Sequence, residues 1–515
     1  MSNQAIQSIV IVGGGTAGWL TAGRIAAEHK HNANIQVTLV ESPDIAPIGV
    51  GEGTWPTMRT TLLKLGISES DFINQCDGSF KQGAKFAKWV TGEDDDFYYH
   101  PLVLPQGFHK TNLAKHWYAQ HQQSGKSFSD LVCYQEAVCE QGLAPKTIRH
   151  GEFDALANYA YHLDSAKFSA FLQQHCCEKL GVKHVLANVV EVTSHQNNDI
   201  ASVITKECGE IFGDLFIDCT GFSALLIGKH YDVDFVACDD VLFIDRALAV
   251  QVPYEHDDSP IASHTISTAQ EAGWIWDIGL QHRRGVGHVF STRHTSVERA
   301  HEQLENYVGK GFENLQVREI PIRSGHRKIF WKNNCVAIGL SAGFLEPLEA
   351  SALVLVELSA QMVAEQLPAC RSVMDVIANR FNQTFHYRWQ RIIDFLKLHY
   401  VLSKRTDNRF WVDNRDPQNI PDSLKELMTL WQYHPPADHD FDSNNEVFPA
   451  ASYQYILYGM GFVTDGLGYP QCPQDEQIAL KQFQLNQQAI DKARQMLPSN
   501  RELITKIRQY GLQRV

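Results

Sequence analysis

No stretch of this sequence is apolar for long enough to cross a membrane. A membrane-spanning helix needs about 20 consecutive apolar residues, whereas the only apolar run near the N-terminus is the short segment Ile9–Val12. That segment also lacks the basic, apolar and small-residue regions that follow one another in a signal peptide. We therefore expect a cytoplasmic protein with no membrane partner.

The cysteines show no pattern that indicates a disulfide framework or a metal site. The 11 cysteines form no CxxC pair, and only Cys176 and Cys177 are adjacent. A structural zinc site or a secreted disulfide scaffold would show regularly spaced pairs. We therefore expect reduced thiols and no metal, although the chain contains 23 histidines.

The sequence has fewer basic than acidic side chains. The 515 residues carry 59 acidic side chains against 45 Lys plus Arg, a formal net charge of −14. Binding to nucleic acid or to an anionic membrane surface relies on an excess of positive charge, so neither is expected as a partner. A hydrophobic content of 44% and a charged content of 20% are typical of a globular protein, and the length allows two or more structural units.

A glycine-rich motif follows the run Ile9–Val12, which we expect to be a strand. It has the form G-x-G-x-x-G and consists of Gly13, Gly14, Gly15, Thr16, Ala17 and Gly18. The first glycine permits a tight turn, the second lets the backbone approach a pyrophosphate, and the third allows close packing of the following helix. A second predicted strand, Ile35–Val40, ends in Glu41, at the offset where an acid binds the ribose hydroxyls of a dinucleotide.

Two later segments also end predicted strands in small residues, Asp218–Phe222 and Gly339–Gly343. Small residues at strand ends allow the backbone to approach a ligand, and the three turns together favour FAD. The segments Gly285–Gly287 and Gly309–Gly311 lack the third glycine of a second fingerprint. Because no nicotinamide site is evident, reduced flavin or its electrons must arrive from elsewhere.

The residue pattern changes from mixed to helical along the chain. A helix is expected over 158–179, closed by Gly181, followed by a βαβ-like section over 182–218 and strands at Arg246–Val252 and Gly287–Ser291. The polar stretch His434–Asn445 is the best candidate for a loop. From residue 350 onward we expect helices over 351–367, 373–402, 422–431, 475–496 and 501–510.

Several side chains could carry chemistry. Lys81 lies in an aromatic segment, as does Lys85, and an apolar environment lowers the pKa of a lysine and makes its amine a usable donor or nucleophile. Without further information, two ordinary strand lysines would be the better interpretation. Glu346 and Glu349 precede a long helix, whose first turn suits acidic side chains or, with Ser351, a small bound anion.

Together these motifs resemble the flavin-dependent halogenases, the tryptophan halogenase family. The resemblance spans most of the chain and is weakest in the last ~100 residues. It is carried by seven segments: Gly13–Trp19, Gly49–Pro56, Phe80–Lys81, Tyr159–Asp164, Trp274–Ile278, Phe344–Glu349 and Leu398–Asp407. The Trp-x-Trp-x-Ile element separates this family from the related flavin hydroxylases.

The resemblance implies an α/β fold with a Rossmann-like FAD-binding core, similar to group A flavin monooxygenases, and a mainly helical C-terminal substrate-binding part. We place the FAD-binding body at 1–350, with substrate-facing insertions near 80–150 and 240–330. The helical part that covers the substrate would occupy 351–515 and be integrated with the first.

The resemblance also implies a reaction. FADH2 from a separate NAD(P)H-dependent flavin reductase reacts with O2, and a halide, chloride or bromide, is oxidised to hypohalous acid. That oxidant reaches Lys81, which hydrogen-bonds it or carries it as a haloamine to a small aromatic substrate. Glu349 then stabilises the cationic intermediate or accepts its proton, while Glu346 has no assigned role. A homodimer is the assembly to test.

The family pattern also implies the remaining site residues. Halide is expected on the backbone N–H groups of Ser351 and Ala352, and the substrate pocket is expected to include His100, Pro101, Trp274 and Trp276. Besides the glycine-rich turn, the cofactor-binding residues would be Glu41, Ser42, Ile45, Gly53, Val190, Leu340 and Leu353.

Departures from the family pattern bear on the substrate and the halide. The family's Glu-Ser-Thr-Gly segment is Glu349–Ala352 here, where alanine in place of glycine would crowd the ion and change halide affinity and choice, for chloride more than for bromide. Leu102 stands where tryptophan halogenases have Phe, and Gly279 replaces a proline. The Tyr-Tyr…Glu clamp for the amino-acid group is missing from 448–462. We therefore predict that an indole without the amino-acid group, or another electron-rich arene, is a better substrate than tryptophan.

Two other functions are compatible with the sequence. A two-component flavin monooxygenase would hydroxylate its substrate instead, which Lys81 and the two tryptophans argue against. A non-catalytic flavin-binding protein is disfavoured because both Lys81 and Glu349 are present.

Overall fold

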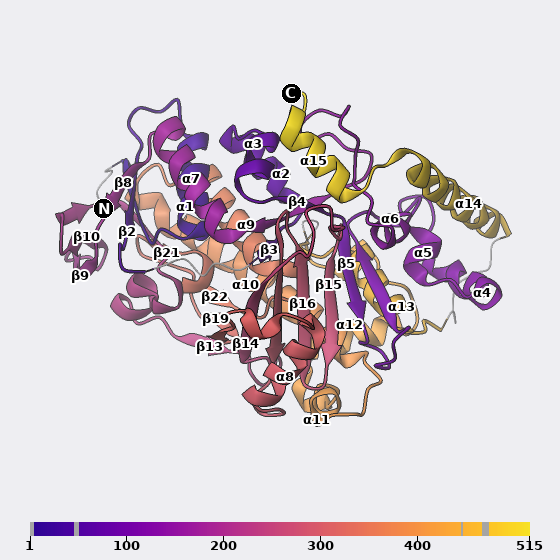
Figure 1. Ribbon diagram of the computed structural model, residues 1–515. Coiled ribbons are helices and arrows are strands. Elements are labelled where there is room, and N and C mark those ends of the chain that lie inside the picture. The colour runs from indigo at the N-terminus through magenta and orange to yellow at the C-terminus, as the bar shows by residue number, and fades with distance from the viewer. Residues whose placement is uncertain (1–4, 46–50, 444–445, 466–472, 515) are drawn as a thin grey trace. The chain divides into compact units, whose positions relative to one another are not determined.

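The computed structural model describes residues 5–45, 51–443, 446–465 and 473–514 (Figure 1). The chain divides into two compact units, each assembled from three separate segments. The first unit is Met1–Gly78, Leu163–Cys238 and Arg323–Trp389, and the second is Ser79–His162, Asp239–Ile322 and Gln390–Val515. This division by packing does not coincide with the functional boundary predicted at residue 350, which stays a prediction.

The first unit is built on a sheet whose central strands are parallel. Its order is β20 (Trp331–Lys332), β21 (Cys335–Ala337), β12 (Leu215–Asp218), β1 (Ser8–Val12), β2 (Gln36–Glu41) and β8 (Lys183–Leu186), with only β20 antiparallel to its neighbour. Ile9, Val10 and Ile11 are fully buried, as expected for a strand covered on both faces. The carboxyl ends of these strands meet at one edge, which is where α/β sheets bind ligands.

Helices pack around α1 (Thr16–Glu28) in this unit. α1 contacts α7 (Ser165–Leu180), α9 (Ser351–Glu365) and α2 (Thr57–Leu65), while α3 (Glu69–Gln75) packs against α7. The tight contact between α1 and the sheet requires a glycine at position 18, because a Cβ atom there would lie 1.9 Å from the backbone oxygen of Gly13.

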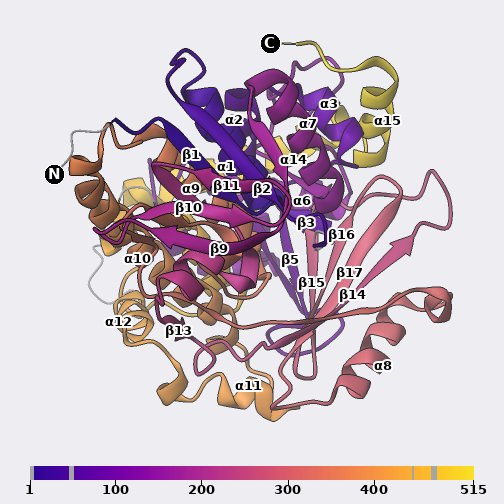
Figure 2. The ribbon, with the colours of Figure 1, turned by 90° about the vertical axis from the view of Figure 1, so that its left-hand side faces the viewer.

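Smaller strands complete the first unit. β9 (Val189–Ser194), β10 (Ile200–Thr205) and β11 (Gly209–Phe212) form an antiparallel sheet (Figure 2). The remaining short strands are β3 (Gly51–Gly53), β13 (Phe235–Ala237), β19 (Gly325–Arg327) and β22 (Gly343–Phe344). The βαβ-like section predicted over 182–218 is therefore wrong. Tight turns at Asn198 and Gly209, both with positive φ, return the chain as hairpins and leave no room for a helix.

The second unit is built on a larger sheet. Its order is β18 (Arg318–Pro321), β14 (Arg246–Pro253), β17 (Arg283–Phe290), β16 (Gly273–Gly279), β15 (Thr265–Gln270), β5 (Gly83–Ala87) and β6 (Phe97–Pro101). Ile275 and its neighbours pack on one face against α8 (Val297–Val308). Because alternate residues point to opposite faces, Trp274 and Trp276 lie on the other face.

Lys81 is the last residue of a short strand in a three-stranded sheet of order β3-β7-β4. β4 (Ser79–Lys81) pairs with β7 (Ala160–Asp164) in antiparallel register. The helix predicted over 158–179 is wrong in its first part, because residues 160–164 form this strand and α7 begins only at Ser165. The Asp164 side chain caps that helix by accepting hydrogen bonds from the backbone N–H groups of Ala166 and Lys167.

Helices form most of the remaining structure. α4 (Ala114–Ser124), α5 (Phe128–Val132) and α6 (Gln135–Glu140) come before β7. After α9 follow α10 (Arg371–Val401), α11 (Arg409–Asp413), α12 (Asp422–Trp431), α13 (Ala450–Gly459), α14 (Pro473–Met496) and α15 (Asn500–Tyr510). The predicted C-terminal helices are confirmed, and with them the α/β fold with a helical C-terminal part.

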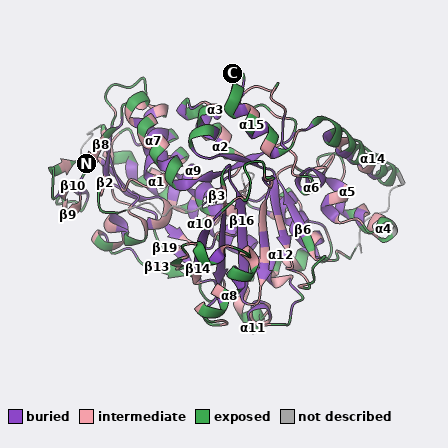
Figure 3. Cartoon of the chain, viewed as in Figure 1, coloured by how far each residue is buried: buried purple, intermediate pink, exposed green. Residues whose placement is uncertain are grey.

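Burial follows this architecture. In Figure 3 the strands of the larger sheet are mostly buried, whereas the outer faces of α8 and α14 are exposed. Within the described segments, no helix combines the length and apolarity needed to cross a membrane. The described part of 434–445 contains only a single helical turn, Asp438–Asp440, and Asn444 and Asn445 lie outside the described residues. The cysteines that the structure describes are free thiols.

Candidate active site

The glycine-rich turn of the first unit contains one glycine that the fold itself does not require. A Cβ atom at Gly13 would lie 2.2 Å from the backbone oxygen of Cys219, so packing alone explains that glycine. A Cβ atom at Gly15 would meet nothing within 4 Å, and the φ of Gly15 is −75°. Open space here, at the uncapped N-terminus of α1, is what a bound pyrophosphate would occupy.

Glu41 ends β2 beside this turn. A Cβ atom at Gly14 would lie 2.1 Å from the carboxyl carbon of Glu41, so glycine at position 14 makes room for the acid. His184 Nε2 lies 3.0 Å from a carboxylate oxygen of Glu41. Partial burial raises the pKa of Glu41, and the pairing with His184 opposes that rise.

The later strand-end turns lie in the same unit and have different local roles. Gly339 (φ 75°) lies against the turn, because a Cβ atom there would be 2.8 Å from the Cβ of Ala17. Asp218 instead organises its own segment. Its carboxylate accepts hydrogen bonds from the N–H groups of Leu226 and Ile227, both at 2.8 Å.

The other predicted cofactor residues differ in exposure. Leu353 is buried on α9 and Gly53 is buried in β3, whereas Ile45 and Val190 are 75% and 63% exposed. Ser42 donates a hydrogen bond of 2.6 Å to Asn188 Oδ1, and Leu340 belongs to a short helical turn, Gly339–Ser341. Gly49 and Val50 of the quoted motif lie outside the described residues.

The turn before α9 carries Glu349. Glu349 (φ 62°, ψ 7°) and Ala350 (φ 55°, ψ 38°) are both left-handed, although neither is glycine. Trp55 Nε1 donates a hydrogen bond of 2.9 Å to the backbone oxygen of Glu349. No side chain caps the N-terminus of α9, so the dipole and first-turn N–H groups at Ser351 and Ala352 suit a small anion.

Lys81 is buried in the second unit. Its side chain shares a face with His162, because His162 pairs with Ser79 and Lys81 is two residues further along β4. Burial, and then the positive charge of Lys81, lower the pKa of His162 well below its ordinary value. His264, also buried, has its pKa lowered to about 4, mainly by burial. The ammonium group of Lys81 therefore lies near a neutral imidazole.

Lys85 has a different environment. Its Nζ forms an ion pair of 2.6 Å with Glu140 and lies 4.2 Å from the ring centre of Phe97. The two lysines of the aromatic segment therefore have different environments, because Lys81 is buried and Lys85 forms a partly exposed ion pair.

The predicted substrate-pocket residues also belong to the second unit. His100 in β6 is buried, and its Nε2 lies 2.9 Å from the hydroxyl of Ser452. Pro101 is the last residue of β6. Trp274 and Trp276 have ring centres 6.5 Å apart, and Trp274 Nε1 donates to the hydroxyl of Tyr400 at 3.1 Å.

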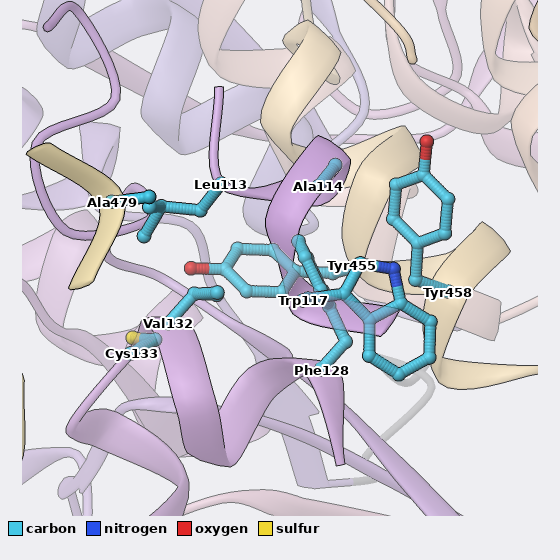
Figure 4. Close-up of a cluster of buried hydrophobic side chains, with 9 residues drawn as sticks. All are labelled: Leu113, Ala114, Trp117, Phe128, Val132, Cys133, Tyr455, Tyr458 and Ala479. Atoms are coloured by element: carbon cyan, nitrogen blue, oxygen red, sulfur yellow. The ribbon is translucent and has the colours of Figure 1, made fainter. Parts of the chain in front are cut away.

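The tyrosines of α13 lie in the protein core. Tyr455 and Tyr458 pack with Trp117 and Phe128 in the cluster shown in Figure 4. The Tyr455 hydroxyl donates to the backbone oxygen of Val103 at 2.8 Å, and that of Tyr458 lies 2.9 Å from Thr464 Oγ1. Both phenols are therefore bonded within the protein.

Three residues in these surroundings were not singled out from the sequence. Burial, and secondarily the nearby Asp164, raise the pKa of Glu52 to about 7. Trp55 donates a hydrogen bond to the turn that carries Glu349. His162 lies beside Lys81, and burial and then the charge of Lys81 lower the pKa of that imidazole. Glu52 and Trp55 belong to the segment Gly49–Pro56 and His162 to Tyr159–Asp164, so the motifs themselves were the available signal.

Comparisons with known proteins identify the family and the fold. The tryptophan halogenase family model matches residues 8–468. The crystal structure of tryptophan halogenase from Shewanella frigidimarina NCIMB 400 is 49% identical, covers 100% of both chains and has a TM-score of 0.97. BrvH, a flavin-dependent halogenase from Brevundimonas sp. BAL3, is 30% identical over 98% of this chain and 99% of its own, with a TM-score of 0.86.

A curated relative matches at similar coverage. The 7-chloro-L-tryptophan 6-halogenase KtzR of Kutzneria sp. (strain 744) is 32% identical over 97% of this chain and 99% of its own length. The chain therefore belongs to the tryptophan halogenase family, whose enzymes are flavin-dependent halogenases.

Proposed function

We propose that this protein halogenates an electron-rich, indole-like arene with FADH2, O2 and a halide ion. In net terms, arene, halide, FADH2, O2 and one proton give halogenated arene, FAD and two waters. The observation that carries the proposal is the burial of Lys81 beside a neutral His162, in a chain of the halogenase family.

The residues of the first unit suit FAD. The open space at Gly15 and the uncapped start of α1 would accept the pyrophosphate, and Glu41 would accept hydrogen bonds from the ribose hydroxyls. When bound and reduced, the flavin would supply two of the four electrons that reduce O2 to water, and the halide would supply the other two. A separate NAD(P)H-dependent reductase supplies FADH2, since the sequence has one dinucleotide fingerprint.

Lys81 would hold the oxidised halogen. Burial orients its amine and keeps bulk water away, which limits loss of a mobile oxidant. The neutral imidazole of His162 adds no second positive charge beside the ammonium group. The amine can thus direct the halogen to one ring position, which a free oxidant would not do.

Glu349 would stabilise the positive charge of the attacked ring or accept its proton at a carboxylate oxygen. The halide would lie on the N–H groups of Ser351 and Ala352. The uncapped first turn of α9 supports this role. The methyl group of Ala352 leaves less space than glycine would, which changes halide affinity and the choice between chloride and bromide.

The substrate is proposed to lack an amino-acid group. In the stretch that replaces the family's clamp, the hydroxyls of Tyr455 and Tyr458 have partners within the protein. A charged substrate end without polar partners loses much affinity. Tryptophan is the second candidate, because KtzR acts on a chlorotryptophan and the Shewanella frigidimarina protein is described as a tryptophan halogenase.

The test is aerobic turnover with FAD, a generic flavin reductase, NADH and bromide, offering indole and tryptophan in parallel and identifying products by mass. A bromine isotope doublet on indole alone supports both the reaction and the substrate class. A doublet on tryptophan keeps the halogenase and refutes the substrate argument. An oxygenated product would indicate a monooxygenase. Flavin binding without any product from a broader panel of arenes would indicate a non-catalytic protein.

A further inference from the structure

The turn that carries Glu349 has an unusual backbone. Glu349 and Ala350 are consecutive non-glycine residues with φ of 62° and 55°. L-residues rarely adopt this region, and they do so where surrounding contacts hold them there. Within the turn, the N–H of Ala350 donates to the backbone oxygen of Pro347 at 3.0 Å.

The second support of this turn comes from far away in the sequence. Trp55 Nε1 donates to the backbone oxygen of Glu349 at 2.9 Å, across 294 positions. Trp55 itself is fixed at the start of α2, because its backbone oxygen accepts a hydrogen bond of 3.0 Å from the N–H of Met58. The indole is therefore presented from the end of a helix.

That helix is attached to α9 at a separate point. Thr57 Oγ1 and Thr61 Oγ1 donate to the two carboxyl oxygens of Glu357, at 3.2 and 2.5 Å. Glu357 lies in the second turn of α9 and is buried. α2 and α9 are thus joined through Glu357, and Trp55 reaches from this joined pair to the turn.

We propose that Trp55 is a positioning residue: its indole N–H holds the left-handed Glu349–Ala350 turn and thereby sets the direction of the Glu349 carboxylate. The expected effect on catalysis rests on the proposed function of Glu349. The expected effect on the backbone of the turn does not depend on that function.

Trp55→Phe tests the role, because it removes the N–H donor and keeps an aromatic ring. We expect kcat for halogenation to fall roughly tenfold, the size of effect that one lost hydrogen bond produces. The KM for bromide should stay within about twofold, since Thr57, Thr61 and Glu357 still hold α9. A fall in kcat with a parallel rise in that KM would indicate general loosening and overturn the proposal.

Ala350→Gly supplies the rescue. Glycine adopts positive φ without steric cost, so the turn then depends less on the indole. The double variant Trp55→Phe/Ala350→Gly should recover most of the lost kcat. Lost ring packing would not be repaired by glycine at position 350, so a double variant as slow as Trp55→Phe would refute a role through the turn.

Trp331→Phe is the matched control, because Trp331 Nε1 also donates to a backbone oxygen, that of Asn333, at 3.1 Å. Its kcat should equal that of the wild type. Hydrogen exchange provides a readout independent of catalysis: the amides of Glu349 and Ala350 should exchange faster in Trp55→Phe and not in Trp331→Phe. Unchanged exchange would overturn the proposal. Faster exchange in a protein that halogenates nothing would keep the positioning role and reject the proposed function.

Discussion

At the scale of single residues, burial distinguishes side chains that look alike in the sequence. Lys81 and Lys85 are four positions apart in one aromatic segment. Lys81 is buried near His162, whereas Lys85 is paired with Glu140. A buried amine can hold a reactive halogen away from water, and a surface ion pair cannot.

Lys81→Ala should therefore abolish halogenation, with a fall in rate of at least about 10²-fold, while FAD binding and NADH-driven peroxide release persist. Lys85→Ala is the control and should keep most of the activity, since an exposed ion pair contributes about 0–1 kcal/mol to stability. Product yield and peroxide, measured in the same reactions, check this. Halogenation that survives in Lys81→Ala would show the assignment to be wrong.

The buried carboxyl group of Glu357 should make the stability of the fold depend on pH. Burial raises the pKa of its carboxyl from 4.5 to about 8, and the hydroxyls of Thr61 and Thr57 oppose the rise. A raised pKa means that the folded state keeps a proton that the unfolded state has lost between about pH 4.5 and 8. Stability should therefore be lost as pH rises through this window, by up to about 1.4 kcal/mol per pH unit.

Glu357→Gln removes this ionisation and keeps the shape of the side chain. Its Tm relative to the wild type should rise from pH 5 to pH 8, as measured by thermal unfolding. Glu426→Gln, at an exposed position of α12, should show no such trend. A constant difference for Glu357→Gln across this range would mean that the buried carboxyl does not titrate there.

At the scale of elements, the glycines at the start of α1 differ in what requires them. Packing requires Gly13 and Gly18, whereas Gly15 faces open space in which a pyrophosphate could bind. Gly15→Ala places a methyl group in open space with an ordinary φ. We expect Tm to stay within about 2 °C, while FAD affinity, measured by flavin fluorescence, falls at least about tenfold because the methyl group meets the pyrophosphate.

Gly18→Ala is the contrasting variant. Its Cβ atom would lie 1.9 Å from the backbone oxygen of Gly13, so the protein should lose about 1–3 kcal/mol or more of stability whether or not FAD is present. If Gly15→Ala bound FAD normally, the turn would not be the pyrophosphate site.

α13 provides a second test at this scale. Tyr455→Phe removes a hydroxyl that donates to Val103 O and leaves that partly buried oxygen without this donor. The expected cost is about 1–3 kcal/mol of unfolding free energy, measured by urea denaturation, with the KM for indole unchanged. A large change in that KM at unchanged stability would instead place the phenol against the substrate.

At the scale of the whole molecule, the proposed site residues fall in different units. The glycine-rich turn proposed to bind FAD and Glu349 belong to the first unit, and Lys81 belongs to the second. With one dinucleotide fingerprint in the sequence, the protein together with FAD and NADH should not bleach the flavin spectrum under anaerobic conditions. Addition of a flavin reductase should bleach it at once, and rapid bleaching without the reductase would reveal an intrinsic reductase activity.

The fold class, the family and the local motifs could be predicted from sequence because they depend on short-range patterns. The strand-turn-helix at Gly13–Gly18 and the C-terminal helices follow from turn chemistry and helical periodicity. The same local reasoning assigned 160–164 to a helix. The strand there depends on pairing with Ser79–Lys81, about 80 positions away, which no local window contains.

The sequence by itself determined that this chain is a flavin-dependent halogenase family member, because glycine turns and catalytic motifs are fixed by spacing along the chain. Only the tertiary structure decided which of two lysines is buried, that Gly15 faces open space, and that Trp55 holds the turn of Glu349. Burial, open space and distant hydrogen bonds are properties of groups brought together by folding, and their sequence separation gives no sign of them.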